Sequence, residues 1–360
     1  MSVIMKIGVI GCGTISKAHF EAIKTIDNAM LIGVADDNLS QATSIAEHYG
    51  CKVYSSNFDL ISDSEINTVV LLTPPGYHAE LIELCALNKK NVLAEKPIGV
   101  SLKDIDNYIN LCKKNDVLLS IVSQHRFDSA TTFARKKIKE GKLGKLVGAN
   151  CSVNWYRDAN YYKSWRGSKE LAGGGVLAIQ AIHTIDLMLW LMGEVESVKA
   201  YIDQMLHSST DVEDTAMACL KFKNGGLGVI SATTSAYPGY PARLDILGTQ
   251  GSLTIEGDEI TFYKSNIEKD ESIIKKSSAK TVSDPSQVSV QSIKAQYEDF
   301  FEALNHGKEL TITSEEARKA FKLLDAIYKS SESDKQVQQL LQREMKQLWI
   351  SRRGKKDAVS

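Results

Sequence analysis

The chain of 360 residues carries 43 Lys and Arg against 44 Asp and Glu, so its formal net charge is −1. This even balance provides no overall field to attract a polyanion, and nucleic acid is not expected as a partner. We find no run of about 18 apolar residues, so a membrane span is not expected either. With 43% apolar residues the chain can bury more than one core, which predicts two domains.

The six cysteines are spread along the chain and include no pair separated by two residues. Zinc sites and dithiol chemistry need such pairs, so no metal site is expected. Scattered thiols are typical of a reducing compartment. The N-terminus runs into a strand-like segment and lacks the ordered regions of a signal peptide. These features together predict a cytoplasmic protein.

Short β-branched runs alternate with longer amphipathic stretches from residue 5 to about 123. This alternation predicts βαβ units around a doubly wound parallel sheet of the Rossmann type, an α/β nucleotide-binding domain over residues 1–123. The runs are KIGVIG at 6–11, MLIGVAD at 30–36, TVVLLT at 68–73, NVLAEKP at 91–97 and VLLSIVS at 117–123.

The pattern changes at residue 124, where an α+β domain over residues 124–335 is predicted to begin. Its strand-like runs are joined by turns too short for anything but antiparallel neighbours, so its sheet should be mostly antiparallel. Helices are predicted over 133–140, 176–191 and 292–305, and from residue 314, where Thr313 and Glu316 match a capping box. Residues 336–360 are expected to form a helical extension and a basic tail.

Gly11 and Gly13 follow the first predicted strand and open a helix, the context in which a Gly-x-Gly pair binds a dinucleotide. With Thr14 and Ile15 they would form the turn that receives the pyrophosphate. Ser16 occupies the place of the usual third glycine, so a plain strand–helix turn remains an alternative for this motif.

Asp36 strengthens the case because it ends the second predicted strand, where a carboxylate can bind the ribose hydroxyls of the adenosine. Asp37 follows it, and two carboxylates would repel a 2′-phosphate, so NAD is predicted as the cofactor and NADP is disfavoured. Asp37 could equally be a solvated residue at the start of a loop.

Thr73 and Pro74 follow the strand at 68–73, at the carboxyl edge where open parallel sheets bind ligands. His78 could line the same cofactor groove, or it could simply be a polar residue in the first turn of the next helix. Glu95 and Lys96 end the strand at 91–97 and complete the predicted cofactor edge.

Lys96 precedes Pro97, which disfavours helical geometry at the lysine and directs its side chain from the edge where nicotinamide should lie. An ammonium there can hold a substrate hydroxyl and stabilise the developing alkoxide. His183 can accept the hydroxyl proton, and Asp186 lies on the same helical face and could orient it. The alternatives are a surface lysine and a core histidine, although a preceding run of three glycines suggests a place where backbone meets ligand.

These motifs together resemble the Gfo/Idh/MocA family of oxidoreductases over roughly residues 5 to 330. The resemblance rests on GCGTISKAH at 11–19, Asp36, TPPGYH at 73–78, EKP at 95–97, and GGG with HTID between 173 and 186. It implies a Rossmann domain followed by an open-faced antiparallel sheet, which the family often uses to build homodimers or homotetramers. It also implies that Lys96 is catalytic and that His183 is its acid/base partner.

Within the family, the region 157–180 looks most like the nucleotide-sugar 3-dehydrogenases, which oxidise the 3-hydroxyl of a UDP-linked amino sugar or its uronic acid. Candidate substrate-binding residues are Arg157, Tyr161, Tyr162, Trp165, Arg166 and Gln180, together with His183. Core packing is the alternative for each aromatic side chain. One departure is Ile179, at a position where the family usually has Asp or Asn, and on an ideal helix Gln180 faces about 100° away from it.

The leading hypothesis is therefore an NAD-dependent dehydrogenase acting on C3 of a nucleotide-linked sugar. A second is a dehydrogenase of a free cyclitol or monosaccharide, and the basic residues between 157 and 166 bear on the choice because a diphosphate needs cationic partners. A third, prompted by Ile179, is an NAD-binding regulatory or structural protein that has lost turnover.

Overall fold

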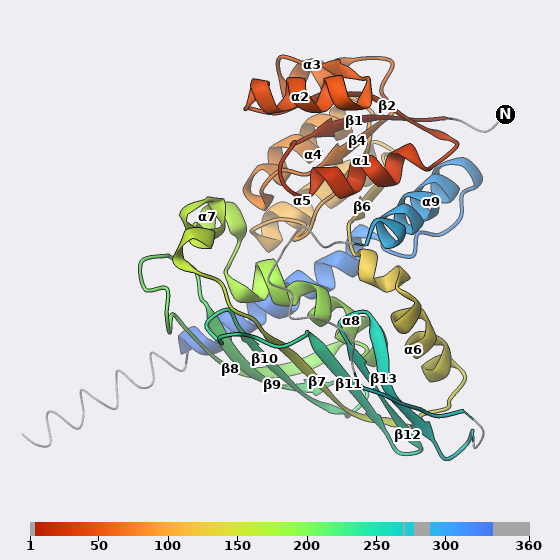
Figure 1. Ribbon diagram of the computed structural model, residues 1–360, viewed down its shortest axis with the longest axis vertical. Coiled ribbons are helices and arrows are strands. Elements are labelled where there is room, and N and C mark those ends of the chain that lie inside the picture. The colour runs from red at the N-terminus through yellow and green to blue at the C-terminus, as the bar shows by residue number, and fades with distance from the viewer. Residues whose placement is uncertain (1–3, 269–270, 277–288, 334–360) are drawn as a thin grey trace, which may run out of the picture.

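The computed structural model describes residues 4–268, 271–276 and 289–333. A parallel sheet flanked by helices forms one end of the molecule, and a second sheet covered by helices on its inner face forms the other (Figure 1). The predicted C-terminal extension at 336–360 lies outside the described residues.

The first sheet has the strand order β3-β2-β1-β4-β5-β6, and each neighbouring pair of these strands is parallel. The order reverses between β1 and β4, and a crevice at such a switch point is where open α/β sheets bind ligands. This confirms the predicted Rossmann arrangement. The strands are β1 (Met5–Ile10), β2 (Ala29–Ala35), β3 (Lys52–Val53), β4 (Thr68–Leu71), β5 (Asn91–Ala94) and β6 (Leu119–Ile121). The helices are α1 (Ser16–Lys24), α2 (Leu39–Tyr49), α3 (Asn57–Ser62), α4 (His78–Leu87) and α5 (Leu102–Lys114).

The second sheet has the order β14-β13-β12-β11-β7-β10-β9-β8. Its described pairs are antiparallel except for β7 with β10, which confirms the mostly antiparallel prediction. The strands are β7 (Leu146–Asn154), β8 (Val195–Asp203), β9 (Thr215–Phe222), β10 (Leu227–Thr233), β11 (Arg243–Gly248), β12 (Gly251–Glu256), β13 (Glu259–Ser265) and β14 (Ile273–Ile274). Helices α6 (Ser129–Lys139) and α8 (Ile182–Met192) pack on its inner face.

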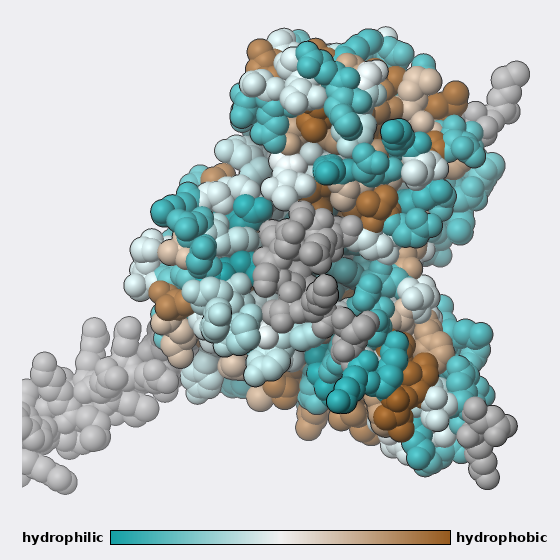
Figure 2. Space-filling model, in the orientation of Figure 1, coloured by the Kyte–Doolittle hydropathy of each residue, from teal (hydrophilic) through white to brown (hydrophobic). Residues whose placement is uncertain are grey.

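The outer face of the second sheet is open. Alternate residues of β9 and β10 are buried and exposed, the period expected of a sheet with one covered face. Met217, Leu227 and Val229 are among the exposed apolar side chains, and Figure 2 shows apolar residues along the lower margin of this domain. An open face of this kind is the feature predicted from the family resemblance.

Helix α9 (Val290–His306) returns to the first domain although it follows the second sheet in the chain. It packs along α1, and its Tyr297 and Phe300 are fully buried in the same core as Val9 and Phe20. The helical segment at 314–333 then runs back across the junction between the two domains (Figure 1). The domains are therefore joined by two further crossings of the chain.

The segment Lys169–Met192 is long and apolar enough to cross a membrane by length and composition, contrary to the expectation from the sequence. However, 83% of its most apolar window is buried inside the protein. Its apolar residues pack against the second sheet, so it has the character of a core helix.

Candidate active site

The glycine turn between β1 and α1 is shaped to admit a ligand. Gly11 has φ +100°, and a Cβ there would lie 2.8 Å from the backbone of Leu72, so this position requires glycine. At Gly13 a Cβ would meet nothing within 4 Å among the described residues. Helix α1 begins after Ile15 without a side-chain cap, so its positive end faces the turn with no side chain in the place of a phosphate. The turn therefore fits the pyrophosphate of a dinucleotide.

Asp36 lies beside this turn at the end of β2. Its carboxylate accepts hydrogen bonds from the backbone N–H of Cys12 at 2.7 Å and of Asn38 at 2.8 Å. Asp37 is exposed next to it. A carboxylate held this way keeps lone pairs for the ribose hydroxyls, so the geometry matches the role predicted from the sequence.

His78 supports the cofactor edge from behind. Its side chain is fully buried, and its Nε2 lies 3.1 Å from the carbonyl oxygen of Thr73. Burial lowers the pKa of His78. The imidazole thus holds the loop of Thr73 and Pro74, both partly exposed, instead of facing a groove itself.

Glu95 is anchored by two residues that the sequence motifs did not single out. His19 Nε2 lies 3.1 Å from one carboxylate oxygen, and His19 Nδ1 lies 2.9 Å from the hydroxyl of Tyr297 on α9. The backbone N–H of Lys96 donates to the other oxygen at 3.0 Å. Burial by itself raises the pKa of Glu95, but the hydrogen bond and charge of His19 and the neighbouring Lys96 lower it overall. Glu95 therefore fixes the backbone from which Lys96 projects.

Lys96 and His183 meet between the two domains. The Lys96 Nζ atom donates to the carbonyl oxygen of Ile179 at 2.9 Å, one turn before His183. Burial lowers the pKa of Lys96, although the charge of Glu95 opposes this shift. Burial, followed by the charges of Lys96 and His125, holds the pKa of His183 well below its ordinary value. The site thus combines a partly exposed lysine of lowered pKa with a neutral imidazole.

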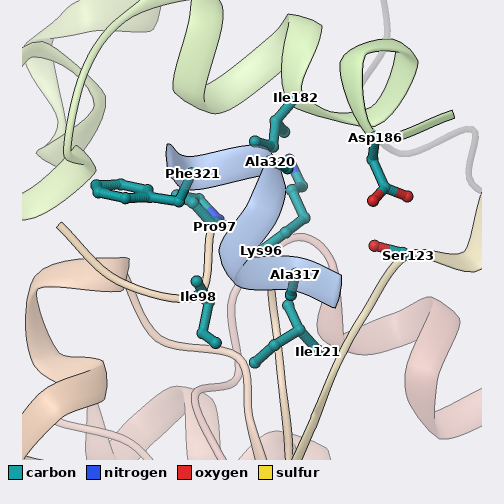
Figure 3. Close-up of a pocket in the computed structure, with 10 residues that line it drawn as sticks. All are labelled: Lys96, Pro97, Ile98, Ile121, Ser123, Ile182, Asp186, Ala317, Ala320 and Phe321. Carbon is teal, nitrogen blue, oxygen red and sulfur yellow. The ribbon is translucent and has the colours of Figure 1, made fainter. Parts of the chain in front are cut away.

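A small pocket, mostly apolar, lies beside Lys96 at the domain junction. Figure 3 shows Lys96 between Ile182 of α8 and the helical segment that carries Ala317 and Ala320. The complete lining consists of Lys96, Pro97, Ile98, Ile121, Ser123, Ile182, Asp186, Ala317, Ala320 and Phe321. Both domains contribute to it, so their packing decides where the ammonium lies.

A π-helical turn over Leu177–Ala181 precedes α8 and presents the Ile179 carbonyl. Such turns are rare and often occur at functional sites. The buried carboxylate of Glu213 accepts from the N–H of Gly175 at 2.8 Å and of Leu177 at 3.0 Å, and from the hydroxyl of Tyr328 at 2.9 Å. Glu213 therefore fixes the entry to this turn.

The triple glycine has a different role from the one predicted. A Cβ on Gly174 would lie 1.9 Å from the Tyr328 hydroxyl, and one on Gly175 would lie 1.7 Å from the Glu213 carbonyl oxygen. Gly173 has φ +76° and ends a short helix. These glycines make room for the protein's own groups, so the expectation of a backbone–ligand contact there was wrong.

Asp186 does not orient His183. Its carboxylate makes a bidentate pair with Arg126, with Nε–Oδ2 at 2.8 Å and Nη2–Oδ1 at 2.6 Å, and both side chains are buried. The ring next to His183 is instead that of His125, with centroids 5.0 Å apart and planes at 86°. The pairing of Asp186 joins residues 60 positions apart, which helical spacing cannot reveal.

A polar and aromatic cluster adjoins Lys96 on the side of the second domain. Gln180 Nε2 donates to the hydroxyl of Tyr161 at 2.9 Å. The guanidinium carbons of Arg157 and Arg166 lie 5.4 Å and 5.0 Å from the centre of the Tyr161 ring. The charge of Arg166 contributes to the lowered pKa of Lys96, which ties this cluster electrostatically to the site.

The other substrate candidates differ in their surroundings. Tyr162 is buried, with its hydroxyl 2.6 Å from Thr234 Oγ1 and its ring tilted by 41° against that of His207, an arrangement typical of core packing. Arg157 is 6% exposed and donates from Nη1 to the carbonyl of Tyr156 at 2.8 Å. Trp165 is partly exposed beneath the guanidinium of Arg166, 4.7 Å from ring centre to guanidinium carbon.

Both halves of the chain match models of one oxidoreductase family. Residues 5–123 match its NAD-binding Rossmann fold, and residues 135–338 match its C-terminal alpha/beta domain. Together with the site, they define an NAD-dependent oxidoreductase. The chain belongs to the Gfo/Idh/MocA family of oxidoreductases.

Three relatives illustrate the range of substrates. The myo-inositol 2-dehydrogenase of Thermotoga maritima is 32% identical over 257 residues, covering 69% of this chain and 74% of that protein. The inositol 2-dehydrogenase of Rhizobium meliloti is 28% identical and covers 70% of this chain and 76% of that protein. The WlbA dehydrogenase from Bordetella pertussis, crystallised with NADH and UDP-GlcNAcA, has a TM-score of 0.81 and 28% identity, covering 92% and 97% of the two chains.

Proposed function

We propose that this protein oxidises the C3 hydroxyl of a nucleotide-linked sugar, with Lys96 and His183 as its catalytic residues. The observation that carries the proposal is a lysine fixed by the Ile179 carbonyl and electrostatically coupled to a neutral imidazole, beside an arginine-bearing cluster. The same residues also serve the reverse reaction, since a group that accepts a proton in one direction donates it in the other.

NAD, when bound in the glycine turn, accepts the hydride that leaves the sugar carbon. The Lys96 ammonium hydrogen-bonds the substrate oxygen and stabilises the negative charge that develops there. The Ile179 carbonyl fixes the direction of that ammonium. His183 is neutral at pH 7 because burial and nearby charge lower its pKa, so it is ready to accept the hydroxyl proton.

The cluster of Tyr161, Arg166 and Gln180 supports a substrate larger than a free sugar. Arginine pairs with carboxylate and diphosphate oxygens through parallel hydrogen bonds. The Oε1 atom of Gln180 is buried and has no hydrogen-bond partner among the residues that the structure describes, so a substrate hydroxyl could donate to it. Trp165 is partly exposed beside Arg166, and the buried Arg157 packs against the Tyr161 ring from within the protein.

A free cyclitol is the second candidate, and the two inositol dehydrogenase relatives favour it. Oxidation of an inositol would use Lys96 and His183, but an inositol has no carboxylate or diphosphate for Arg166 to bind. The candidates can therefore be separated by testing whether Arg166→Ala raises the KM of the preferred substrate.

We further propose that the open face of the second sheet joins two or more copies of the chain in the cytoplasm. Exposed apolar side chains on β9 and β10 support this assignment, because contiguous apolar patches usually mark interaction sites. Light scattering of the wild type and of a Met217→Glu, Val229→Glu double variant tests it. The double variant should have the mass of a smaller assembly.

The catalytic proposal is tested by NADH formation with a panel of UDP-sugars, hexoses and inositols. Lys96→Met keeps the length of the side chain but removes the ammonium, and should lower kcat by about 10²-fold or more. Lys52→Met, at an exposed lysine of the first domain, is the matched control and should retain full activity. A Lys96→Met enzyme with undiminished turnover would exclude the proposed role. The absence of turnover by the wild type with every sugar would favour the third hypothesis, an NAD-binding protein without catalysis.

A further inference from the structure

A histidine–aspartate pair lies beside His183 and is not accounted for by the mechanism above. His125 Nδ1 is 2.7 Å from Asp128 Oδ2, within the stretch that joins β6 to α6. The rings of His125 and His183 are in edge-to-face contact at 5.0 Å between centroids. Two imidazoles from different elements, the stretch after β6 and helix α8, therefore lie next to each other.

The carboxylate of Asp128 is committed to this pair. Asp128 occupies the N-cap position of α6, where aspartate usually caps the helix, yet its side chain makes no cap hydrogen bond. It accepts instead from His125 and from the hydroxyl of Ser292 on α9. A carboxylate fixed in this way holds the Nδ1–H tautomer of the histidine and leaves Nε2 as a proton acceptor.

Both histidines are partly accessible. The side chain of His125 is 36% exposed, whereas that of Asp128 is 8% exposed, and desolvation together with nearby charge lowers the pKa of His183. Among the described residues, Asp128 is the charged group paired with His125, and Lys96, from the end of β5, acts on the neighbouring His183. Ser292 is its polar neighbour through Asp128 on α9. A proton placed on His183 is thus opposed by the ammonium and has an outward route through His125.

We propose that His125, positioned by Asp128, relays the substrate proton from His183 to solvent. The proposal rests on the function proposed above. The O–H bond of the sugar breaks as the carbon is oxidised, and the proton binds a ring nitrogen of His183. It then passes, directly or through a water molecule, to Nε2 of His125, which releases it to bulk water with Nδ1–H still held by Asp128. His183 returns to its neutral form, so charge and protons balance.

The test is His125→Asn, which keeps a polar side chain but removes the proton acceptor. It should lower kcat by about tenfold, with little change in KM, and added imidazole should restore part of the loss. Asp128→Asn should lower kcat by a smaller factor, because His125 remains but is no longer held in one tautomer. His48→Asn, at an exposed histidine of α2, is the matched control and should behave as the wild type. An unchanged kcat, or a loss that imidazole does not restore, would overturn the relay.

A second measurement separates this proposal from the function on which it rests. If the wild type oxidises no sugar in the panel, the proposed function fails, and ¹⁵N NMR of the histidine rings still tests the pair. The neutral His125 ring should carry its proton on Nδ1 in the wild type and should lose this preference in Asp128→Asn. A neutral ring protonated on Nε2 would exclude the relay whatever the turnover.

Discussion

The Lys96 ammonium is held by a main-chain atom, the carbonyl oxygen of Ile179, at 2.9 Å. The side chain of Ile179 is apolar and buried, so it cannot perform the hydrogen bonding expected of the Asp or Asn that usually stands there in the family. The π-turn over Leu177–Ala181 presents the carbonyl instead. The departure at residue 179 therefore leaves the ammonium with a fixed acceptor.

Glu213→Ala should destabilise the protein because the carboxylate fixes the entry to the π-turn. Three donors lose their acceptor, and burial leaves them without full access to water, so the free energy of unfolding should fall by about 3 kcal/mol. Urea unfolding measures the change. Tyr328→Phe removes one of the three bonds and should cost about 1 kcal/mol. Equal losses for the two variants would contradict this account.

Asp186→Asn should destabilise the fold without removing the proton acceptor from the site. Arg126 would remain buried with Glu316 at 3.5 Å as its remaining carboxylate, and the expected loss in the free energy of unfolding is about 3 kcal/mol. Asp106→Asn breaks a more exposed pair with Arg318 and should cost less than about 1 kcal/mol. Thermal and urea unfolding of both variants test the contrast. A selective change in the pH profile of turnover by Asp186→Asn would instead restore its predicted link to His183.

The sequence was sufficient to predict the parallel sheet, the glycine turn and the acidic residue at the end of β2. These features follow from local patterns, which state where a strand ends and which backbone shape must follow. The partners of Asp186 and Glu95 could not be found that way, because Arg126 and His19 reach them from distant parts of the chain. The angle of about 100° between the side chains of Ile179 and Gln180 holds for an ideal α-helix. The π-turn over Leu177–Ala181 changes that angle.

His125 was missed for a related reason. A lone histidine in a short connecting stretch has no periodic signal, and its contact with His183 joins residues 58 positions apart in the chain. The sequence did place His125 within three residues of Asp128, a spacing at which a carboxylate can hold an imidazole. That spacing was the available signal for the pair.

Gly11→Ala should lower the stability of the protein, whereas Gly13→Ala should lower its affinity for NAD. At Gly11 the added Cβ meets the backbone of Leu72 and φ is +100°, so the variant should lose about 1–3 kcal/mol of stability. At Gly13 the Cβ enters open space, so stability should be unchanged while the Kd for NAD rises. Urea unfolding and NADH fluorescence titration measure the two effects. A fully stable Gly11→Ala protein would contradict the first expectation, and unaltered NAD affinity in Gly13→Ala the second.

His183→Asn should flatten the dependence of stability on pH. The folded-state pKa of His183 lies well below its ordinary 6.5, so below pH 6.5 the unfolded chain binds a proton that the folded protein does not. The free energy of unfolding therefore falls as the pH decreases, by up to about 1.4 kcal/mol per pH unit for each such group. His78 contributes in the same direction because burial lowers its pKa as well. Urea unfolding between pH 7 and pH 5 should show a shallower decline in the variant, and parallel curves would contradict the assignment.

The choice of NAD over NADP should depend on Asp36 and Asp37 in different ways. Asp36 supports the glycine turn through the N–H groups of Cys12 and Asn38, so Asp36→Ser should weaken the binding of both cofactors. Asp37 is exposed, and Asp37→Arg should leave the turn intact while it exchanges a repulsive charge for an attractive one. One charged hydrogen bond of about 1.5 kcal/mol corresponds to about a tenfold gain in NADP affinity. Because Asp36 still faces the 2′-phosphate in that variant, the full change in preference needs both substitutions. The Kd values for NADH and NADPH in the two single variants and the double variant measure this preference. If Asp36→Ser alone changed the preference and Asp37→Arg added nothing, Asp36 would be the residue that discriminates between the two cofactors.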